Sequence, residues 1–91
     1  AKGAVIALTK GLAREAGPFD ITVNAVSPAL TDTEMTSVLA PQARAQLLAQ
    51  MPLGRAGTPR DIAAAVCFLA SAEAGFVTGE IMDVDGGFMR D

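Results

Sequence analysis

Histidine, tyrosine and tryptophan are absent from this 91-residue sequence, and cysteine occurs once, at Cys67. Without histidine, the chain by itself holds no Ser-His-Asp triad and no histidine metal site. A single cysteine excludes an internal disulfide and a thiolate metal site, and it is typical of a reducing compartment. Because nothing nearby in the sequence would activate its thiol, we expect Cys67 to be a small core residue and not a nucleophile. We therefore expect no metal site.

Basic runs, long apolar runs and glycine-rich phosphate loops are also missing. The net charge is −3, so we expect no nucleic-acid partner. The longest apolar run, residues 62–70, is too short to span a bilayer, and we expect no membrane partner. The stretch Asp85-Gly86-Gly87 has turn chemistry and does not match GxGxxG.

What is present indicates an α/β protein with the order helix, strand, long loop, helix, strand. Apolar spacing predicts a helix over residues 2–16, which Gly17-Pro18 ends. Residues 21–26 are rich in β-branched side chains and almost continuously apolar, which is typical of a parallel strand buried on both faces. A second strand is predicted over residues 80–84. Two such strands are not a stable sheet alone, so further strands must lie upstream or in another chain.

Two stripes run along the first predicted helix. One stripe is apolar and consists of Val5, Leu8 and Leu12. The other consists of the small residues Gly3, Ala7 and Gly11. Glycine inside a helix costs about 1 kcal/mol relative to alanine. Two glycines on one face therefore suggest that another backbone approaches closely. Either the parent sheet or a second subunit would supply that backbone.

The long loop is predicted to contain a helix from Pro41 to Gln50. A connection of this length with a poorly anchored helix is typical of a lid over a site, although a plain surface excursion is the alternative. The lid residues Met35, Leu39 and Met51 would then face an apolar substrate or anchor the lid to the core.

Two polar groups at the element ends are expected to have local partners. Thr58, Pro59 and Asp61 predict a capped helix start close to a capping box. Asn24 interrupts the first strand, and a buried amide must find hydrogen-bond partners. We expect Asn24 to connect neighbouring backbone segments, with direct ligand contact as the less favoured alternative.

The end of the first strand is a candidate ligand site. The apolar strand runs directly into Ser27-Pro28-Ala29 and then into a polar loop with Thr31 and Thr33. Ligands of open α/β sheets bind outside the carboxyl ends of the strands. We therefore expect a cofactor or substrate at this loop.

Four stretches, in this order and spacing, resemble the short-chain dehydrogenase/reductase family. They are AKGAV at residues 1–5, ITVNAVSP at 21–28, PLGR at 52–55 and VDGG at 84–87. The resemblance covers the whole chain. Within the family, the chain is most similar to the bacterial 3-oxoacyl-acyl carrier protein reductases.

The resemblance implies the C-terminal part of a Rossmann-type doubly wound parallel sheet. Residues 1–91 would be a fragment of a single NAD(P)-binding domain, with a substrate lid at about 31–57. Lys2 would be the catalytic lysine of a Tyr-x-x-x-Lys motif whose tyrosine lies upstream of Ala1. Lys2 would bind the nicotinamide ribose and lower the pKa of that tyrosine, which then acts as general acid or base.

The nicotinamide loop of the family matches this chain over the strand end. The implied cofactor-binding residues are, besides Lys2, Pro28, Ala29, Leu30, Thr31 and Thr33. The backbone at Thr31 would pair with the carboxamide, and the Thr33 hydroxyl would reach carboxamide or phosphate oxygens. Ala29 replaces the usual glycine, and Thr31 replaces the usual Ile or Val. If the turn needs φ > 0, Ala29 costs about 1 kcal/mol or more.

The implied activity is that of an NAD(P)-dependent oxidoreductase, with NAD and NADP both open. It would interconvert a ketone and a secondary alcohol by hydride transfer, with a ketone, alcohol or acyl thioester as substrate. A cytoplasmic homotetramer is expected. The alternatives are a sugar, steroid or small-alcohol dehydrogenase, or a non-catalytic binding or assembly relative. The 91-residue fragment alone is expected to be inactive, because the tyrosine and the nucleotide site lie outside it.

Overall fold

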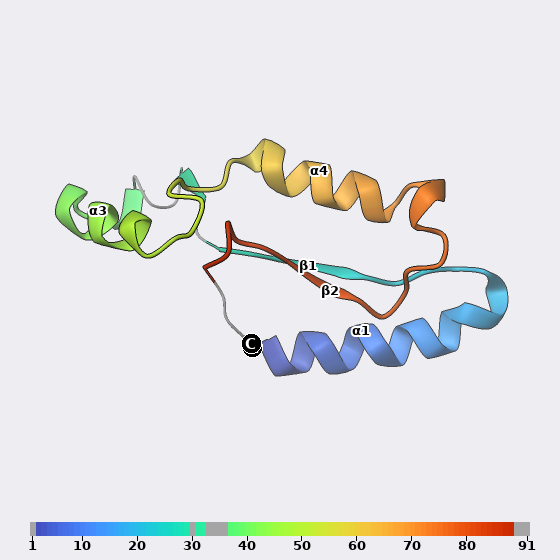
Figure 1. The fold of residues 1–91 in the computed structure, drawn as a ribbon. Coiled ribbons are helices and arrows are strands. Elements are labelled where there is room, and N and C mark those ends of the chain that lie inside the picture. Colours follow the sequence, from blue (N-terminus) through green and yellow to red (C-terminus); the bar gives the residue numbers. More distant parts are fainter. Residues whose placement is uncertain (1, 30, 33–36, 89–91) are drawn as a thin grey trace. The chain divides into compact units, whose positions relative to one another are not determined.

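The computed structural model describes residues 2–29, 31–32 and 37–88. Its helices and strands are α1 (Lys2–Ala16), α3 (Pro41–Ala49), α4 (Pro59–Leu69), β1 (Ala25–Pro28) and β2 (Ile81–Val84), with short 3₁₀ helices at Gly17–Phe19 and Ala72–Ala74 (Figure 1). The chain divides into two compact units. The first combines Ala1–Val26 with Ala64–Met82, and the second combines Ser27–Ala63 with Asp83–Asp91.

Helix α1 has the bounds that the sequence predicts. The 3₁₀ helix Gly17–Phe19 follows it, and Asp20 ends that turn with a φ of 60° and an N–H donated to the Gly17 carbonyl at 2.9 Å. The buried residues of α1 are Thr9 and Ala13, one turn apart. The hydrogen-bonding requirement of the Thr9 hydroxyl is met within the helix, since it donates to the Val5 carbonyl at 2.7 Å.

Both stripes predicted on α1 are exposed among the described residues. Leu8 of the apolar stripe is 62% exposed. A Cβ at Gly3 or Gly11 of the small stripe would meet nothing within 4 Å. The expected close approach of another backbone is therefore not made by the described part of the chain, which buries the neighbouring line through Thr9 and Ala13 instead.

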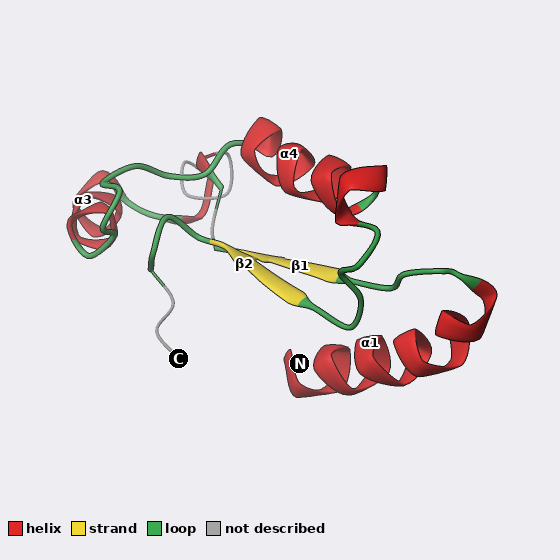
Figure 2. Cartoon of the chain, turned by 45° about the vertical axis from the view of Figure 1, so that its right-hand side comes forward, coloured by secondary structure: helices red, strands yellow, loops and turns green. Residues whose placement is uncertain are grey.

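Strands β1 and β2 form a two-stranded sheet, drawn in yellow in Figure 2. The Ala25 N–H donates to the Glu80 carbonyl at 2.9 Å, and the Ala29 N–H donates to the Val84 carbonyl at 3.4 Å. Both partners advance by four residues, from 25 to 29 and from 80 to 84, so the strands are parallel. This pairing agrees with the α/β class predicted from the apolar runs.

The first strand begins later than predicted, at Ala25 and not at residue 21. The backbone before Ala25 also makes hydrogen bonds, but they do not follow the regular pattern of a parallel β-ladder. The Val23 N–H donates to the Thr78 hydroxyl at 3.0 Å, and the Val23 carbonyl accepts the Gly79 N–H at 2.7 Å. A side-chain oxygen thus replaces a carbonyl as the partner at this end.

Asn24 joins the two backbone segments that enter the sheet. Its Nδ2 donates to the Val77 carbonyl at 3.1 Å, and its Oδ1 accepts the Glu80 N–H at 3.0 Å. The prediction that this amide connects neighbouring backbone is confirmed. A half-buried amide with both ends engaged fixes the register of β1 against β2.

Helix α4 begins at Pro59, directly after Thr58, as predicted. Leu69 is its buried residue. The prediction that Cys67 is a core residue is wrong for the described chain, since Cys67 is exposed, as are Val66 and Phe68. The apolar face of α4 is broad, and the described residues cover it in part: Ile62 and Ala65 are half-buried beside the buried Leu69. No helix in the described ranges combines the length and hydropathy required to cross a membrane.

Candidate functional site

The residues that follow β1 and β2 line a pocket in the second compact unit. Its volume is about 160 Å³, and it is lined by Ala29, Met51, Leu53, Arg55, Gly57, Asp61, Val84, Asp85 and Gly86. The pocket lies at the carboxyl ends of two parallel strands, where open α/β sheets bind ligands. This volume is smaller than the roughly 300 Å³ or more that small-molecule sites usually enclose.

Ala29 stands in the turn without backbone strain. Its N–H donates to the Val84 carbonyl at 3.4 Å, and its side chain is half-buried. Among the described residues other than glycine, only Asp20 has a positive φ. Ala29 therefore does not adopt the left-handed conformation that would have required glycine. Pro28, the residue before it, is exposed.

The predicted cofactor loop is fastened to the segment that precedes α4. Thr31 and Gly57 form an isolated parallel bridge, and the Asp32 N–H donates to the Gly57 carbonyl at 2.7 Å. Leu30 and Thr33, which were also predicted to bind the cofactor, lie outside the described residues, as does Met35. The main chain at Thr31 is thus held in place by the segment that precedes α4.

Lys2, the predicted catalytic lysine, is the first residue of α1 and is exposed. It belongs to the first compact unit, whereas the loop with Pro28, Ala29 and Thr31 belongs to the second. The described structure brings Ala29 to the pocket and Thr31 to Gly57. The role of Lys2 stays a prediction.

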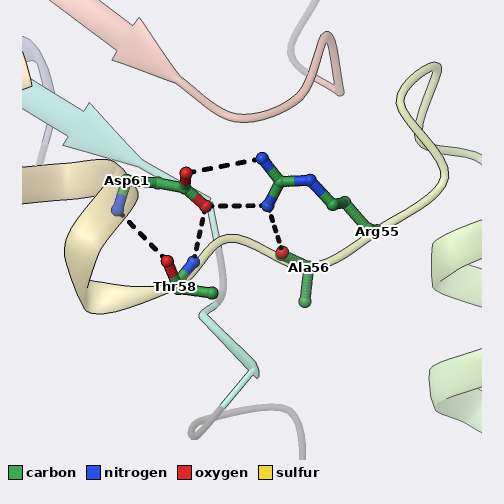
Figure 3. A network of polar contacts seen from close by, with 4 residues as sticks. All are labelled: Arg55, Ala56, Thr58 and Asp61. Atoms are coloured by element: carbon green, nitrogen blue, oxygen red, sulfur yellow. Dashed lines mark hydrogen bonds and ion pairs between the residues drawn. The ribbon is translucent and has the colours of Figure 1, made fainter. Parts of the chain in front are cut away.

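A network of four residues surrounds the start of α4 (Figure 3). Thr58 and Asp61 form the predicted capping box: the Asp61 N–H donates to the Thr58 hydroxyl at 3.2 Å, and the Thr58 N–H donates to Asp61 Oδ2 at 2.9 Å. Arg55 adds a forked ion pair, with Nη1 at 2.8 Å from Asp61 Oδ2 and Nη2 at 3.4 Å from Oδ1. Arg55 Nη1 also donates to the Ala56 carbonyl at 3.2 Å.

The network keeps the Asp61 carboxylate ionised. The hydrogen bond from Arg55, followed by the one from the Thr58 N–H, holds the pKa of Asp61 well below its ordinary range. The same pair raises the pKa of Arg55. Sequence reasoning found the Thr58–Asp61 box but missed Arg55, because a loop residue six positions before the aspartate has no periodicity to connect them.

Met51 is one of the two described lid residues predicted to face substrate or core. It is 6% exposed and lines the pocket. The main chain beside it is bonded, since the Leu53 N–H donates to the Gly86 carbonyl at 3.1 Å. Met51 thus anchors the end of the loop, while Leu39 is half-buried.

The predicted turn after β2 closes the pocket. Gly86 and Gly87 have φ values of 61° and 88°. The Gly87 N–H donates to the Asp85 carboxylate at 2.9 Å, as in an Asx turn. No group of three or more His, Cys, Asp or Glu side chains in the described ranges is placed to hold a metal ion.

Comparisons with known proteins find similarity over nearly the whole chain. The profile of a family described as enoyl-(acyl carrier protein) reductase matches residues 1–89. The chain is 51% identical over 87 residues to the 3-oxoacyl-[acyl-carrier-protein] reductase FabG of Vibrio cholerae, a match covering 96% of this chain and 36% of that protein. It is 54% identical over 85 residues to the 3alpha-hydroxysteroid dehydrogenase of Mediterraneibacter gnavus, covering 93% of this chain and 34% of that protein.

A solved structure shares the fold. The crystal structure of a 3-oxoacyl-[acyl-carrier protein] reductase from Brucella melitensis matches with a TM-score of 0.90 and 41% identity, over 98% of this chain and 34% of that one. The chain therefore spans about a third of the length of the relatives that it matches.

Proposed function

The chain belongs to the short-chain dehydrogenase/reductase family and has part of its Rossmann-type α/β fold, and from this premise we propose that the full-length protein is an NAD(P)-dependent oxidoreductase. It interconverts a ketone and a secondary alcohol by hydride transfer. The observation that carries the proposal is the pocket at the carboxyl ends of β1 and β2, beside a loop whose main chain is fixed at Thr31.

The residues of this chain fit the nicotinamide end of a dinucleotide. A planar carboxamide requires a fixed donor and a fixed acceptor, and main chain held by hydrogen bonds after a strand supplies both with little freedom. The unstrained turn at Ala29 and the bridge from Thr31 to Gly57 provide that rigidity. Pro28, Ala29, Leu30, Thr31 and Thr33 would hold the carboxamide end, and the bound cofactor, NAD or NADP, would supply or accept the hydride.

Lys2 provides the positive charge of the reaction. Its ammonium would hold the nicotinamide nucleotide by donating to the ribose hydroxyls. It also favours the phenolate form of a tyrosine supplied by the rest of the protein, because a nearby cation stabilises an anion. That tyrosine then exchanges a proton with the substrate oxygen near neutral pH.

The substrate that we propose is a 3-oxoacyl thioester. The Vibrio cholerae and Brucella melitensis relatives bear the name of reductases for such substrates. A hydroxysteroid is the second candidate, because the Mediterraneibacter gnavus relative is named a 3alpha-hydroxysteroid dehydrogenase and is 54% identical to this chain. The apolar side chains of Met51 and Leu53 at the pocket suit either substrate. We propose a cytoplasmic homotetramer.

A substrate panel tests this proposal on the full-length protein. Reduced nicotinamide absorbance would be followed with 3-oxoacyl thioesters, 3-ketosteroids, sugars and small ketones, each with NADH and NADPH. Turnover that is fastest with the thioesters supports the first candidate, and turnover fastest with the steroids supports the second. Absence of both turnover and cofactor binding contradicts the enzymatic proposal and favours a non-catalytic relative.

A further inference from the structure

The peptide unit between Gly57 and Thr58 is bonded at both ends. Its carbonyl, from Gly57, accepts the Asp32 N–H at 2.7 Å. Its N–H, from Thr58, donates to Asp61 Oδ2 at 2.9 Å. A single rigid plane therefore connects the first turn of α4 with the residue that follows Thr31.

The two hydrogen bonds strengthen each other. An ionised acceptor at the N–H end draws positive charge to that end and leaves the carbonyl oxygen more negative. Hydrogen bonds to charged groups are shorter and stronger than neutral ones. The contact from the Asp32 N–H to the Gly57 carbonyl is 2.7 Å long, at the short end of the ordinary range.

Arg55 fixes the carboxylate that holds this peptide. Its two guanidinium nitrogens contact both oxygens of Asp61, and its Nη1 also contacts the Ala56 carbonyl. The Ala56 carbonyl belongs to the peptide unit immediately before the shared one. Through the contacts to Ala56 and Thr58 drawn in Figure 3, Arg55 and Asp61 restrain the peptide units on both sides of Gly57.

We propose that Arg55 and Asp61 are a positioning pair for the cofactor loop, acting on Thr31 and Asp32 through the Gly57–Thr58 peptide. They set the place of the Thr31 main chain and do not touch the cofactor. This inference rests on the proposed function, in which that main chain pairs with the nicotinamide carboxamide.

The test compares two variants that cut the network at different points in the full-length protein. Asp61→Asn weakens the bond to the Thr58 N–H and removes the ion pair. Thr58→Ala removes only the hydroxyl of the helix cap and retains the bond from the Thr58 N–H to Asp61. Helix capping is weakened in both variants, but only Asp61→Asn disturbs the acceptor at the shared peptide.

Cofactor affinity is the first readout. Asp61→Asn is expected to raise the KM for the nicotinamide cofactor about tenfold, the order expected when a hydrogen bond to a charged group is lost. The KM for the second substrate is expected to change less than about twofold, and Thr58→Ala is expected to lower Tm with little change in cofactor KM. A purely structural role predicts equal effects of the two variants on KM, and that result would overturn the proposal.

Substitutions of Arg55 perturb the network less and provide a second test in case Asp61→Asn does not fold. Arg55→Gln is expected to raise the cofactor KM, and Arg55→Lys to recover part of the loss, because lysine keeps the charge but not the fork. Arg60→Gln removes a neighbouring charge outside the network and is expected to leave KM unchanged. An unchanged KM in Arg55→Gln would overturn the proposal.

Amide hydrogen exchange of Asp32 separates this inference from the proposed function. Exchange at Asp32, followed by NMR without cofactor, is expected to be about tenfold faster in Asp61→Asn than in Thr58→Ala. This readout needs no turnover. Faster exchange in a protein without oxidoreductase activity would retain the peptide link and remove the cofactor role, whereas equal exchange rates would overturn the link itself.

Discussion

Whether alanine is tolerated at position 29 depends on the backbone φ angle of that residue. The family resemblance predicts glycine at this position, and an alanine with φ > 0 would strain the turn. The described backbone has no positive φ at Ala29, whose N–H reaches the Val84 carbonyl. The substitution is therefore compatible with the turn.

Replacing Ala29 by glycine is consequently expected to destabilise the protein. Glycine at a position without strain gives only more freedom to the unfolded chain, at a cost of about 0.4–1 kcal/mol. Urea unfolding of the full-length Ala29→Gly variant measures this difference. A gain in stability would show that Ala29 is strained after all.

Gly87 is the opposite case, because its φ of 88° and its surroundings both require glycine. A Cβ at this position would lie 2.9 Å from Cγ of Pro52. Gly87→Ala is expected to cost about 1–2 kcal/mol from the backbone alone, with an added loss from the contact. Thermal unfolding checks this, and an unchanged Tm would refute the described turn geometry.

The first turn of helix α4 is stabilised by an ion pair as well as by the capping box. The Asp61 carboxylate receives hydrogen bonds from Arg55 and from the Thr58 N–H, and these hold its pKa below the ordinary value in the folded protein. The ionised carboxyl is therefore favoured more in the folded than in the unfolded chain. Its stabilisation is present above the unfolded pKa and is lost as the pH falls through the folded one.

The difference in Tm between the wild type and Asp61→Asn should follow this rule. We expect it to be largest above about pH 5 and to shrink as the pH falls below the ordinary aspartate pKa of about 3.9. It should also shrink at high salt, since the pair is exposed. A Tm difference that stays constant or grows on acidification would contradict the proposed contribution of the Arg55–Asp61 network to stability.

The sequence predicted those elements whose ends carry local signals. Gly17-Pro18 ended α1 correctly, and Pro41 and Thr58-Pro59 marked the starts of α3 and α4. The start of β1 was misplaced because the ladder before Ala25 is replaced by contacts of Val23 to Thr78 and Gly79, which are distant in sequence. Arg55 was missed for a related reason, since an ion pair between a loop and a helix has no periodicity.

Burial was predicted less well than secondary structure, because burial depends on the neighbours that a chain has. Cys67, Val66 and Phe68 lie on an apolar face of α4 and are nevertheless exposed. Leu8 of α1 is exposed as well. Uncovered apolar faces on both helices are what we expect of a chain that belongs to a longer protein, and the relatives that it matches are about three times as long.

The small stripe of α1 provides a test of that larger assembly. In the described chain Gly11 is open, and on an open helix surface Gly11→Leu would stabilise by about 1 kcal/mol or less. If a sheet or a second subunit covers the stripe in the full-length protein, the same change is expected to cost about 1–3 kcal/mol through overpacking. We expect the loss, measured by thermal unfolding, with sedimentation reporting whether the proposed tetramer dissociates.

At the scale of the whole molecule, Lys2 is the catalytic cation of the proposed nicotinamide-dependent oxidoreductase. The most direct measurement is the turnover of full-length wild type, Lys2→Ala and Lys10→Ala, followed by reduced nicotinamide absorbance. Lys10 is a second lysine of α1, bonded to the Gly79 carbonyl, and controls for the loss of a positive charge from that helix. We predict that Lys2→Ala lowers kcat at least about a hundredfold and that Lys10→Ala changes it little. Wild-type turnover that survives in Lys2→Ala would contradict the account.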